Sequence, residues 1–222
     1  MGNVRRLTIF DLDGTLIDSR QDLADSANQL IVELGGTPLS LDDVAGMVGS
    51  GARVLVQRAL TAAGISEPSS ALPRFLEIYD ERLLNHTRLY DGIVDAVQKA
   101  REYGQVSVLT NKPLAMSEKI LDGLAARELF DGIIGGDGPY PRKPDPASLF
   151  ALMTAAGVSG AETLLVGDSR IDLQTARNAS VSCCIVRYGF DGAADVVAAA
   201  DWAVDDASAL CQVLDRWARG QT

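Results

Sequence analysis

Residues 7–16 read LTIFDLDGTL, a short apolar run that ends in two carboxylates one residue apart. The run from Leu7 to Phe10 has the composition of a buried β-strand, and alternate residues of an extended chain point to the same side. Asp11 and Asp13 therefore project toward the same space, where like charges repel unless a cation or a shared proton holds them. Open α/β folds bind ligands beyond the carboxyl ends of their strands. The stretch thus predicts an α/β fold with a Mg²⁺ site, in which one carboxylate attacks and the other moves protons.

The composition is that of an ordinary globular protein with an acidic balance. The chain has 222 residues, of which 47% are hydrophobic and 23% are charged, and its formal net charge is −10. This charge argues against nucleic acid and anionic membranes as general partners. The N-terminal apolar run is too short for a signal peptide or a membrane span, and Cys183, Cys184 and Cys211 lack the spacing of metal ligands. We expect a cytoplasmic protein with reduced cysteines, either a monomer or a small homo-oligomer.

Apolar runs typical of strands alternate with helical patterns along most of the chain. The runs are Leu7–Phe10, Val106–Leu109, Gly132–Ile134, Leu164–Val166, Cys183–Val186 and, more weakly, Trp202–Val204. Short apolar runs separated by amphipathic helices are typical of parallel sheets that are covered on both faces. The pattern predicts a doubly wound parallel sheet.

An insertion of a different kind follows the first strand. Between Leu16 and about Leu84 the chain shows helical periodicity and no convincing strand pattern, with helices expected near residues 23–34, 41–48, 53–63 and 72–84. We therefore expect residues 16–85 to form a small all-α cap domain, and residues 1–15 and 86–222 to form the α/β core domain. A cap above the end of the first strand could exclude water and contact the substrate.

Three further segments place polar side chains at the ends of apolar strands or in a nearby loop. Thr110 and Asn111 follow the second strand-like run, Lys143 lies between an arginine and a proline in RKPDP, and Asp168 and Asp172 come one helical turn apart after a later strand. In a parallel sheet these groups meet at one edge. Carboxylates fit Mg²⁺, and a metal, an ammonium and a hydroxyl together can hold a phosphoryl group, as can the backbone N–H groups near Asn111.

These four motifs, in this order between Asp11 and Asp172, resemble those of the haloacid-dehalogenase superfamily of phosphohydrolases. The resemblance implies a Rossmann-like core and a covalent mechanism. Asp11 would be the nucleophile that forms an aspartyl-phosphate, and Asp13 would protonate the leaving group and then activate water. An aspartate at position 13 favours phosphate-ester chemistry over dehalogenation or the cleavage of a phosphorus–carbon bond.

The resemblance also implies roles for the other motif residues. Thr110, with Asn111 beside it, would bind the phosphoryl group, and Lys143 would offset negative charge there. Asp168 would bind Mg²⁺ together with Asp11 and the backbone carbonyl of Asp13. Asp172 would support the metal from outside its direct ligands, through waters or through Lys143.

The helical insertion is similar to the C1-type cap of this superfamily. Its residues 47–55, MVGSGARVL, resemble the cap loop of bacterial phosphoglycolate phosphatases. Ser50 in this loop is a candidate substrate contact. Arg53, which follows a Gly-Ser-Gly turn, is either a residue that binds a substrate carboxylate or a solvated helix residue. The chain departs from that pattern in having Ser50 where Asn or Asp is more frequent, and Ser180 where Gly is usual.

The resulting hypothesis is a Mg²⁺-dependent phosphomonoesterase that acts on a small phosphorylated metabolite, with 2-phosphoglycolate as the first candidate. Two alternatives stay open. A phosphosugar mutase of the β-phosphoglucomutase type shares the core motifs, and a phosphate-binding or regulatory protein could keep the metal site without turnover. Specificity depends on the cap, so the motifs of the core do not decide between these functions.

Overall fold

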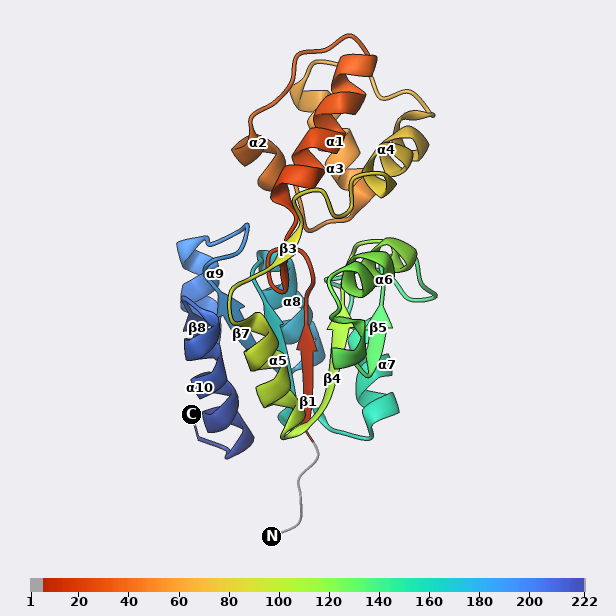
Figure 1. The fold of residues 1–222 in the computed structure, drawn as a ribbon. Helices are drawn as coiled ribbons and strands as arrows, with labels where there is room; N and C mark the ends of the chain where they lie inside the picture. Colours follow the sequence, from red (N-terminus) through yellow and green to blue (C-terminus); the bar gives the residue numbers. More distant parts are fainter. Residues whose placement is uncertain (1–5, 222) are drawn as a thin grey trace.

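The computed structural model describes residues 6–221, which form an α/β core with a bundle of helices above it (Figure 1). The core sheet has six parallel strands in the order β5-β4-β1-β6-β7-β8. The strands are β1 (Arg6–Phe10), β4 (Gly104–Leu109), β5 (Gly132–Ile134), β6 (Thr163–Gly167), β7 (Ser182–Val186) and β8 (Trp202–Val204). Each strand-like run of the sequence forms one of these strands, so the predicted fold class is confirmed.

Helices cover both faces of this sheet. One face packs against α5 (Ile93–Arg101), α6 (Leu114–Gly123) and α10 (Ala207–Ala218), and the other against α7 (Ala147–Ala156), α8 (Arg170–Ala179) and α9 (Ala194–Ala199). Two short 3₁₀ helices, Arg127–Leu129 and Gly160–Glu162, precede β5 and β6. Because side chains alternate along a strand, Phe10 belongs to the first layer and Ile9 to the second. The adjacent Cys183 and Cys184 are likewise buried on opposite faces, and neither forms a disulfide.

Four helices form the bundle above the carboxyl edge of the sheet (Figure 1). They are α1 (Arg20–Glu33), α2 (Leu41–Ala45), α3 (Ala52–Ala62) and α4 (Ala71–Asp80). The apolar stripe of α1, which includes Leu23, Leu30 and Ile31, is buried in the centre of the bundle. The limits of the cap domain, residues 16–85, stay a prediction. We propose these limits because all four helices lie within them. Within residues 6–221 no helix is both long enough and apolar enough to cross a membrane.

A short two-stranded sheet joins the bundle to the core, where the sequence showed no strand pattern. It pairs β2 (Ile17–Asp18) antiparallel with β3 (Arg88–Leu89). Strands of two residues are too short to show alternation, so they could not be recognised from the sequence. The buried carboxylate of Asp22 in α1 accepts hydrogen bonds from the backbone N–H groups of His86 and Thr87 and from the Thr87 hydroxyl. These contacts tie the start of α1 to the returning chain.

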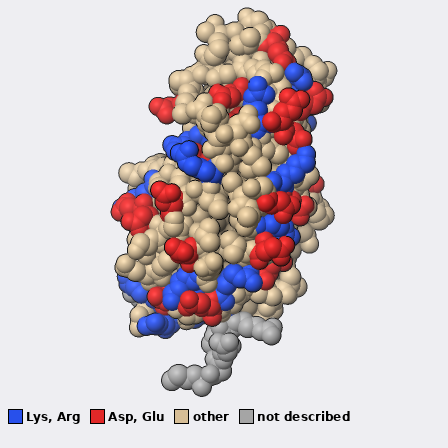
Figure 2. All heavy atoms as spheres, viewed as in Figure 1, with Lys and Arg blue, Asp and Glu red and all other residues tan. Residues whose placement is uncertain are grey.

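Charged side chains of both signs are interspersed over the core and the bundle on the face shown in Figure 2. Several form ion pairs at the surface, such as Arg74 with Glu33 at 2.8 Å within the bundle. Lys119 of α6 pairs with Asp80 of α4 at 2.6 Å and so connects the core to the bundle. Exposed pairs of this kind contribute little to stability, about 0–1 kcal/mol each. The excess of acidic groups therefore has its main chemical effect where carboxylates are buried.

Candidate active site

Three motif residues lie directly after neighbouring strands of the sheet. Asp11 follows β1, Thr110 follows β4 and Asp168 follows β6, and β1 is hydrogen-bonded to both of the other strands. All three side chains are buried beneath the helical bundle. The parallel order of the strands thus brings together residues that are far apart in the sequence.

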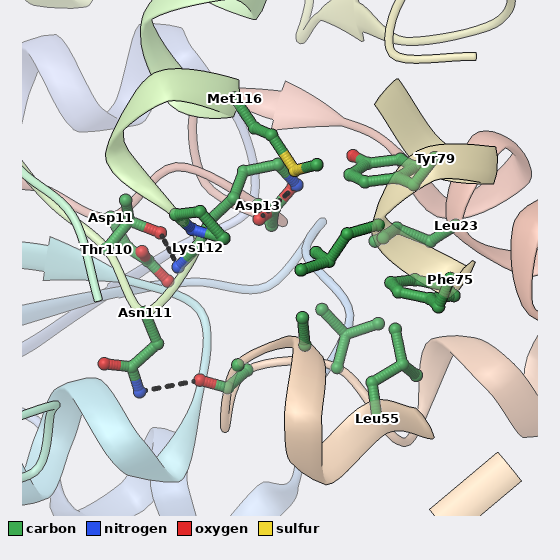
Figure 3. A pocket seen from close by; sticks show the side chains of 16 residues that line it. Asp11, Asp13, Leu23, Leu55, Phe75, Tyr79, Thr110, Asn111, Lys112 and Met116 are labelled. Carbon is green, nitrogen blue, oxygen red and sulfur yellow. Dashed lines mark hydrogen bonds and ion pairs between the residues drawn. The ribbon is translucent and has the colours of Figure 1, made fainter. Parts of the chain in front are cut away.

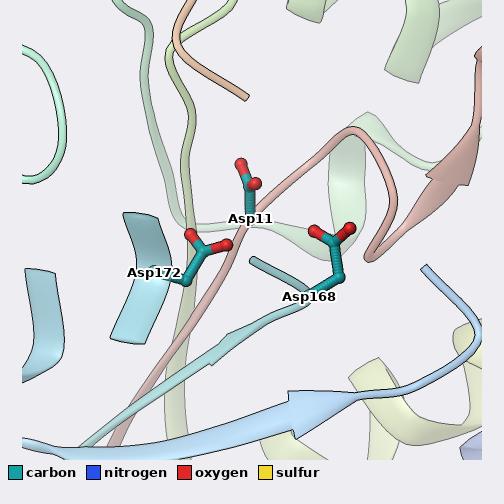
Figure 4. A group of neighbouring side chains, drawn as sticks. All are labelled: Asp11, Asp168 and Asp172. Carbon is teal, nitrogen blue, oxygen red and sulfur yellow. The ribbon is translucent and has the colours of Figure 1, made fainter. Parts of the chain in front are cut away.

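Three carboxylates form a buried acidic cluster at this edge. Carboxylate oxygens of Asp11, Asp168 and Asp172 lie within 4.8 Å of one another (Figure 4). The ammonium of Lys143 is 2.8 Å from Oδ1 of Asp11 and 2.6 Å from Oδ1 of Asp172, and its side chain is almost fully buried. One ammonium faces three carboxylates, so the ionised cluster carries an excess of negative charge.

Burial and mutual repulsion shift the ionisation of this cluster. Burial raises the pKa of Asp11 to about 7, although Lys143 acts in the opposite direction. Burial, reinforced by Asp172 and Asp11, also raises the pKa of Asp168 well above its usual value. For Lys143 burial disfavours the charged form, but Asp11 and Asp172 outweigh it and raise the pKa of the ammonium. A cation bound beside these carboxylates would relieve the repulsion.

Asp172 has both of its oxygens engaged by other groups. Ser169 is the N-cap of α8, and its hydroxyl accepts a hydrogen bond from the backbone N–H of Asp172. In return, Oδ2 of Asp172 accepts hydrogen bonds from the Ser169 hydroxyl and N–H at 2.6 and 3.1 Å. This capping box fixes the side chain while Oδ1 contacts Lys143. Asp172 is therefore placed to position Lys143.

Two glycines make room for the carboxylate of Asp168. A Cβ added to Gly14 would lie 2.3 Å from Oδ2 of Asp168, and Gly14 also has a φ of +87°. A Cβ added to Gly189 would lie 2.2 Å from the Cβ of Asp168. The backbone N–H of Phe190 donates to the same Oδ2 at 2.7 Å, and the Thr15 hydroxyl donates to Oδ1 at 3.3 Å. The backbone thus encloses Asp168 closely, which only glycine permits at these two positions.

Asn111 acts as a clamp between three segments. Its amide donates to the carbonyl of Gly49 at 2.9 Å and to that of Lys143 at 3.0 Å, and its oxygen accepts from the Lys143 N–H at 2.9 Å. The bond to Gly49, in the loop before α3, is drawn in Figure 3. The amide therefore holds the Lys143 loop against the end of β4. Phosphate binding near Asn111 stays a prediction that concerns the backbone rather than this side chain.

Lys112 is a residue to which the sequence analysis gave no function. Its ammonium lies 2.8 and 2.9 Å from the two carboxylate oxygens of Asp13 (Figure 3). The Ser19 hydroxyl also donates to Asp13. The side chain of Lys112 is only 5% exposed. Its position directly after Thr110 and Asn111, at the end of a predicted strand, was the signal available in the sequence.

A cavity separates the core from the helical bundle at this point. Its core side contains Asp11, Asp13 and residues 110–113, and its bundle side is largely apolar. The lining residues of the bundle are Leu23, Val48, Gly49, Gly51, Ala52, Leu55, Phe75, Leu76 and Tyr79. Ser50 lines an adjoining hollow beside Asp168, together with Arg58. Arg53 is exposed and lines neither the cavity nor the adjoining hollow, so its position does not support the predicted contact with substrate, which stays a prediction.

Comparisons with known proteins agree with this arrangement. A family model described as haloacid dehalogenase-like hydrolase matches residues 8–186. The chain is 42% identical over 200 residues to a phosphoglycolate phosphatase of Pseudomonas putida, covering 86% of this chain and 72% of that protein. It is 39% identical over 194 residues to phosphoglycolate phosphatase 1 of Pseudomonas aeruginosa, covering 84% and 71%.

The fold is also shared with solved structures. The crystal structure of a predicted phosphoglycolate phosphatase from Haemophilus somnus superposes with a TM-score of 0.88 at 29% identity, covering 94% of this chain and 97% of that one. The match therefore includes the helical bundle as well as the sheet. With its motif residues gathered at one edge of a parallel sheet, the protein belongs to the haloacid dehalogenase-like hydrolases.

Proposed function

We propose that the protein is a Mg²⁺-dependent phosphatase for a small phosphorylated metabolite, with 2-phosphoglycolate as the best candidate. The observation that carries the proposal is the buried cluster of Asp11, Asp168 and Asp172 with Lys143 between two of its members. Such an arrangement suits a metal ion and an anion at a buried site. The names of the relatives in Pseudomonas supply the candidate substrate.

The donor set of the cluster fits Mg²⁺, a hard cation that prefers oxygen ligands and keeps several waters. Asp11 and Asp168 would hold the ion, with the backbone carbonyl of Asp13 as a third ligand. Asp172 would act indirectly, because one of its oxygens contacts Lys143 and the other caps α8. The bound ion would offset the charge of the carboxylates and of the phosphoryl oxygens, which the single ammonium of Lys143 cannot neutralise alone.

The chain's own residues can carry out both halves of the reaction. Asp11 would attack phosphorus in line, forming an aspartyl-phosphate while the bond from phosphorus to the ester oxygen breaks. Asp13 would give a proton to that leaving oxygen and later take one from the water that hydrolyses the intermediate. Lys143, 2.8 Å from the Asp11 carboxylate, would stabilise the charge of the transferring group, and the Thr110 hydroxyl would donate a hydrogen bond to it.

The apolar bundle side of the cavity favours a small leaving group over a sugar. The hydroxyl groups of a hexose phosphate need hydrogen-bond partners when they are buried. Among the bundle residues that line the cavity, Tyr79 alone has a polar side-chain group, which is too few for the several hydroxyls of a hexose. This argues against the phosphosugar mutase. The intact set of acidic and basic groups argues against a binding protein without turnover.

The test is phosphate release from a panel containing 2-phosphoglycolate, hexose phosphates and pyrophosphate, with Mg²⁺ and with EDTA. We expect turnover that requires Mg²⁺ and strongly favours 2-phosphoglycolate. Asp11→Asn serves as the control for contaminating phosphatases. Isomerisation of a hexose phosphate without phosphate release would favour the mutase instead. The absence of turnover with every member of the panel would contradict the assignment as a phosphatase.

A further inference from the structure

Beside Asp13, the cavity contains a buried cation from its core side and a buried hydroxyl group from its bundle side. The ammonium of Lys112, from the core, lies 4.6 Å from the centre of the Tyr79 ring, which belongs to α4 of the bundle. Tyr79 is 2% exposed, and its hydroxyl has no hydrogen-bond partner among the described residues. Figure 3 shows this hydroxyl directed toward the pair formed by Lys112 and Asp13. A buried hydroxyl without an acceptor is unfavourable, so this position is suited to an acceptor from a ligand.

The charge of this cavity is distributed unevenly. Among the described residues that line it, Lys112 is the one cation, the carboxylates of Asp11 and Asp13 lie on the core side with it, and the bundle side is apolar apart from the Tyr79 hydroxyl. An ammonium has three donor hydrogens, and a second acceptor can bind beside the Asp13 carboxylate. The part of the substrate that leaves with the ester oxygen must occupy this region, because Asp11 and Asp13 stand at its core side. The cavity therefore fits a short leaving group with one negative charge.

We propose that Lys112 and Tyr79 form an anion subsite that binds the carboxylate of the leaving group. The inference rests on the proposed function, and it replaces Arg53 as the group expected to recognise a carboxylate. Lys112 supplies the charge and Tyr79 supplies a hydrogen bond through its hydroxyl. Because one residue comes from the core and the other from the bundle, the subsite is complete only when the two face each other as they do here.

The geometry also limits the length of the substrate. The ester oxygen must lie within hydrogen-bond distance of Asp13 to receive its proton, and Lys112 contacts the same carboxylate at 2.8 Å. A carboxylate attached one carbon away from the ester oxygen, as in 2-phosphoglycolate, can reach the ammonium. A chain with additional carbons would carry its carboxylate past Lys112 toward the apolar wall.

The experiment compares kcat/KM for 2-phosphoglycolate with kcat/KM for ethyl phosphate, which lacks the carboxylate. Lys112→Met should reduce the preference for 2-phosphoglycolate by roughly 100-fold, because a buried charged contact is lost. Tyr79→Phe, which keeps the ring, should reduce it by roughly 10-fold, mainly through KM. Lys119→Met and Tyr90→Phe are matched controls, because Lys119 is exposed and the unpartnered Tyr90 hydroxyl lies outside the cavity lining. Both should retain the preference of the wild type.

Lys112 also contacts Asp13, so its substitution is expected to slow the hydrolysis of every ester. Binding to the Asp11→Asn variant, measured by calorimetry with Mg²⁺, removes this ambiguity because no proton transfer is involved. In that background, adding Lys112→Met should weaken the binding of 2-phosphoglycolate, while the Kd for ethyl phosphate should change by no more than about 3-fold. Equal losses for both ligands would overturn the subsite while leaving the phosphatase intact. A wild-type enzyme that hydrolyses other esters without preferring 2-phosphoglycolate would instead overturn the proposed substrate.

Discussion

Replacing Asn111 with alanine should destabilise the protein substantially, because this amide connects three segments at the site. It makes two buried hydrogen bonds to the main chain of Lys143 and one partly buried bond to the carbonyl of Gly49. Each such bond contributes about 1 kcal/mol, and the main-chain groups that lose their partner stay largely buried. We therefore expect Asn111→Ala to lower the free energy of unfolding by about 2–4 kcal/mol.

Urea unfolding followed by circular dichroism measures this difference. For a chain of this size, about 3 kcal/mol corresponds to a fall in Tm of roughly 6–12 °C. Asn178→Ala is the matched control. This exposed amide of α8 donates one hydrogen bond, at 2.8 Å, to the carbonyl of Pro144 in the Lys143 loop. It should cost about 0.5 kcal/mol or less.

The same substitution should reduce activity, because Asn111 fixes the backbone of Lys143, whose ammonium contacts Asp11. We expect kcat to fall by roughly 10-fold or more at a temperature where the variant is folded. Unfolding free energies of Asn111→Ala and wild type that agree within about 0.5 kcal/mol would refute the reasoning, since the three bonds would then contribute nothing.

Three further predictions concern the acidic cluster. Asp11→Asn should lower turnover by roughly 10⁴-fold or more while circular dichroism shows an unchanged fold, and normal turnover would contradict the role of Asp11 as nucleophile. Burial raises the pKa of Asp11 from 3.8 to about 7 and raises that of Asp168 well above 3.8. At pH values between 3.8 and these raised pKa values, the folded state therefore binds more protons than the unfolded chain. The stability of the metal-free protein should then fall as pH rises from 5 to 8, and the increase in Tm on adding Mg²⁺ rather than EDTA should be larger at pH 8. A metal-free Tm that rises over this pH range would contradict the predicted direction. Gly14→Ala should destabilise by roughly 1–3 kcal/mol in thermal unfolding, because its φ is +87° and the new Cβ would meet the Asp168 carboxylate; a variant as stable as wild type would show that the backbone relaxes freely.

The strand segments and the strand-end position of the motif residues were accessible from the sequence, whereas the order of the strands in the sheet came from the structure. Short apolar runs bounded by Asp11, Thr110 and Asp168 predicted the strands, and in a parallel sheet their ends share one edge. The helical insertion was recognisable for the same local reason, since α1 shows its buried stripe in the spacing of Leu23, Leu30 and Ile31.

The contacts of long side chains were not accessible in this way. Arg53 was a candidate for binding the substrate carboxylate, and this stays a prediction. Both Arg53 and Arg58 of α3 are exposed, but of the two only Arg58 lines the hollow beside Asp168. The motif shows that the cap helix carries an arginine, but the direction of that side chain depends on how α3 packs against α1 and α4. The paired strands β2 and β3 escaped recognition because their two-residue length carries no pattern.

The sequence by itself determined the class of fold and the presence of Asp11, Asp168 and Asp172 at one edge of the sheet, because strand periodicity and strand-end motifs are local properties. It also predicted Asp13 in the same space, but the Asp13 carboxylate pairs with Lys112 instead. Only the tertiary structure decided how the remaining polar groups are used. The capping of α8 by Asp172, the clamp formed by Asn111 and the approach of Tyr79 to Lys112 each join residues that are distant in the chain or depend on a side-chain direction. Such contacts follow from how the bundle and the sheet pack together, and burial then makes each unpaired charge or hydroxyl energetically significant.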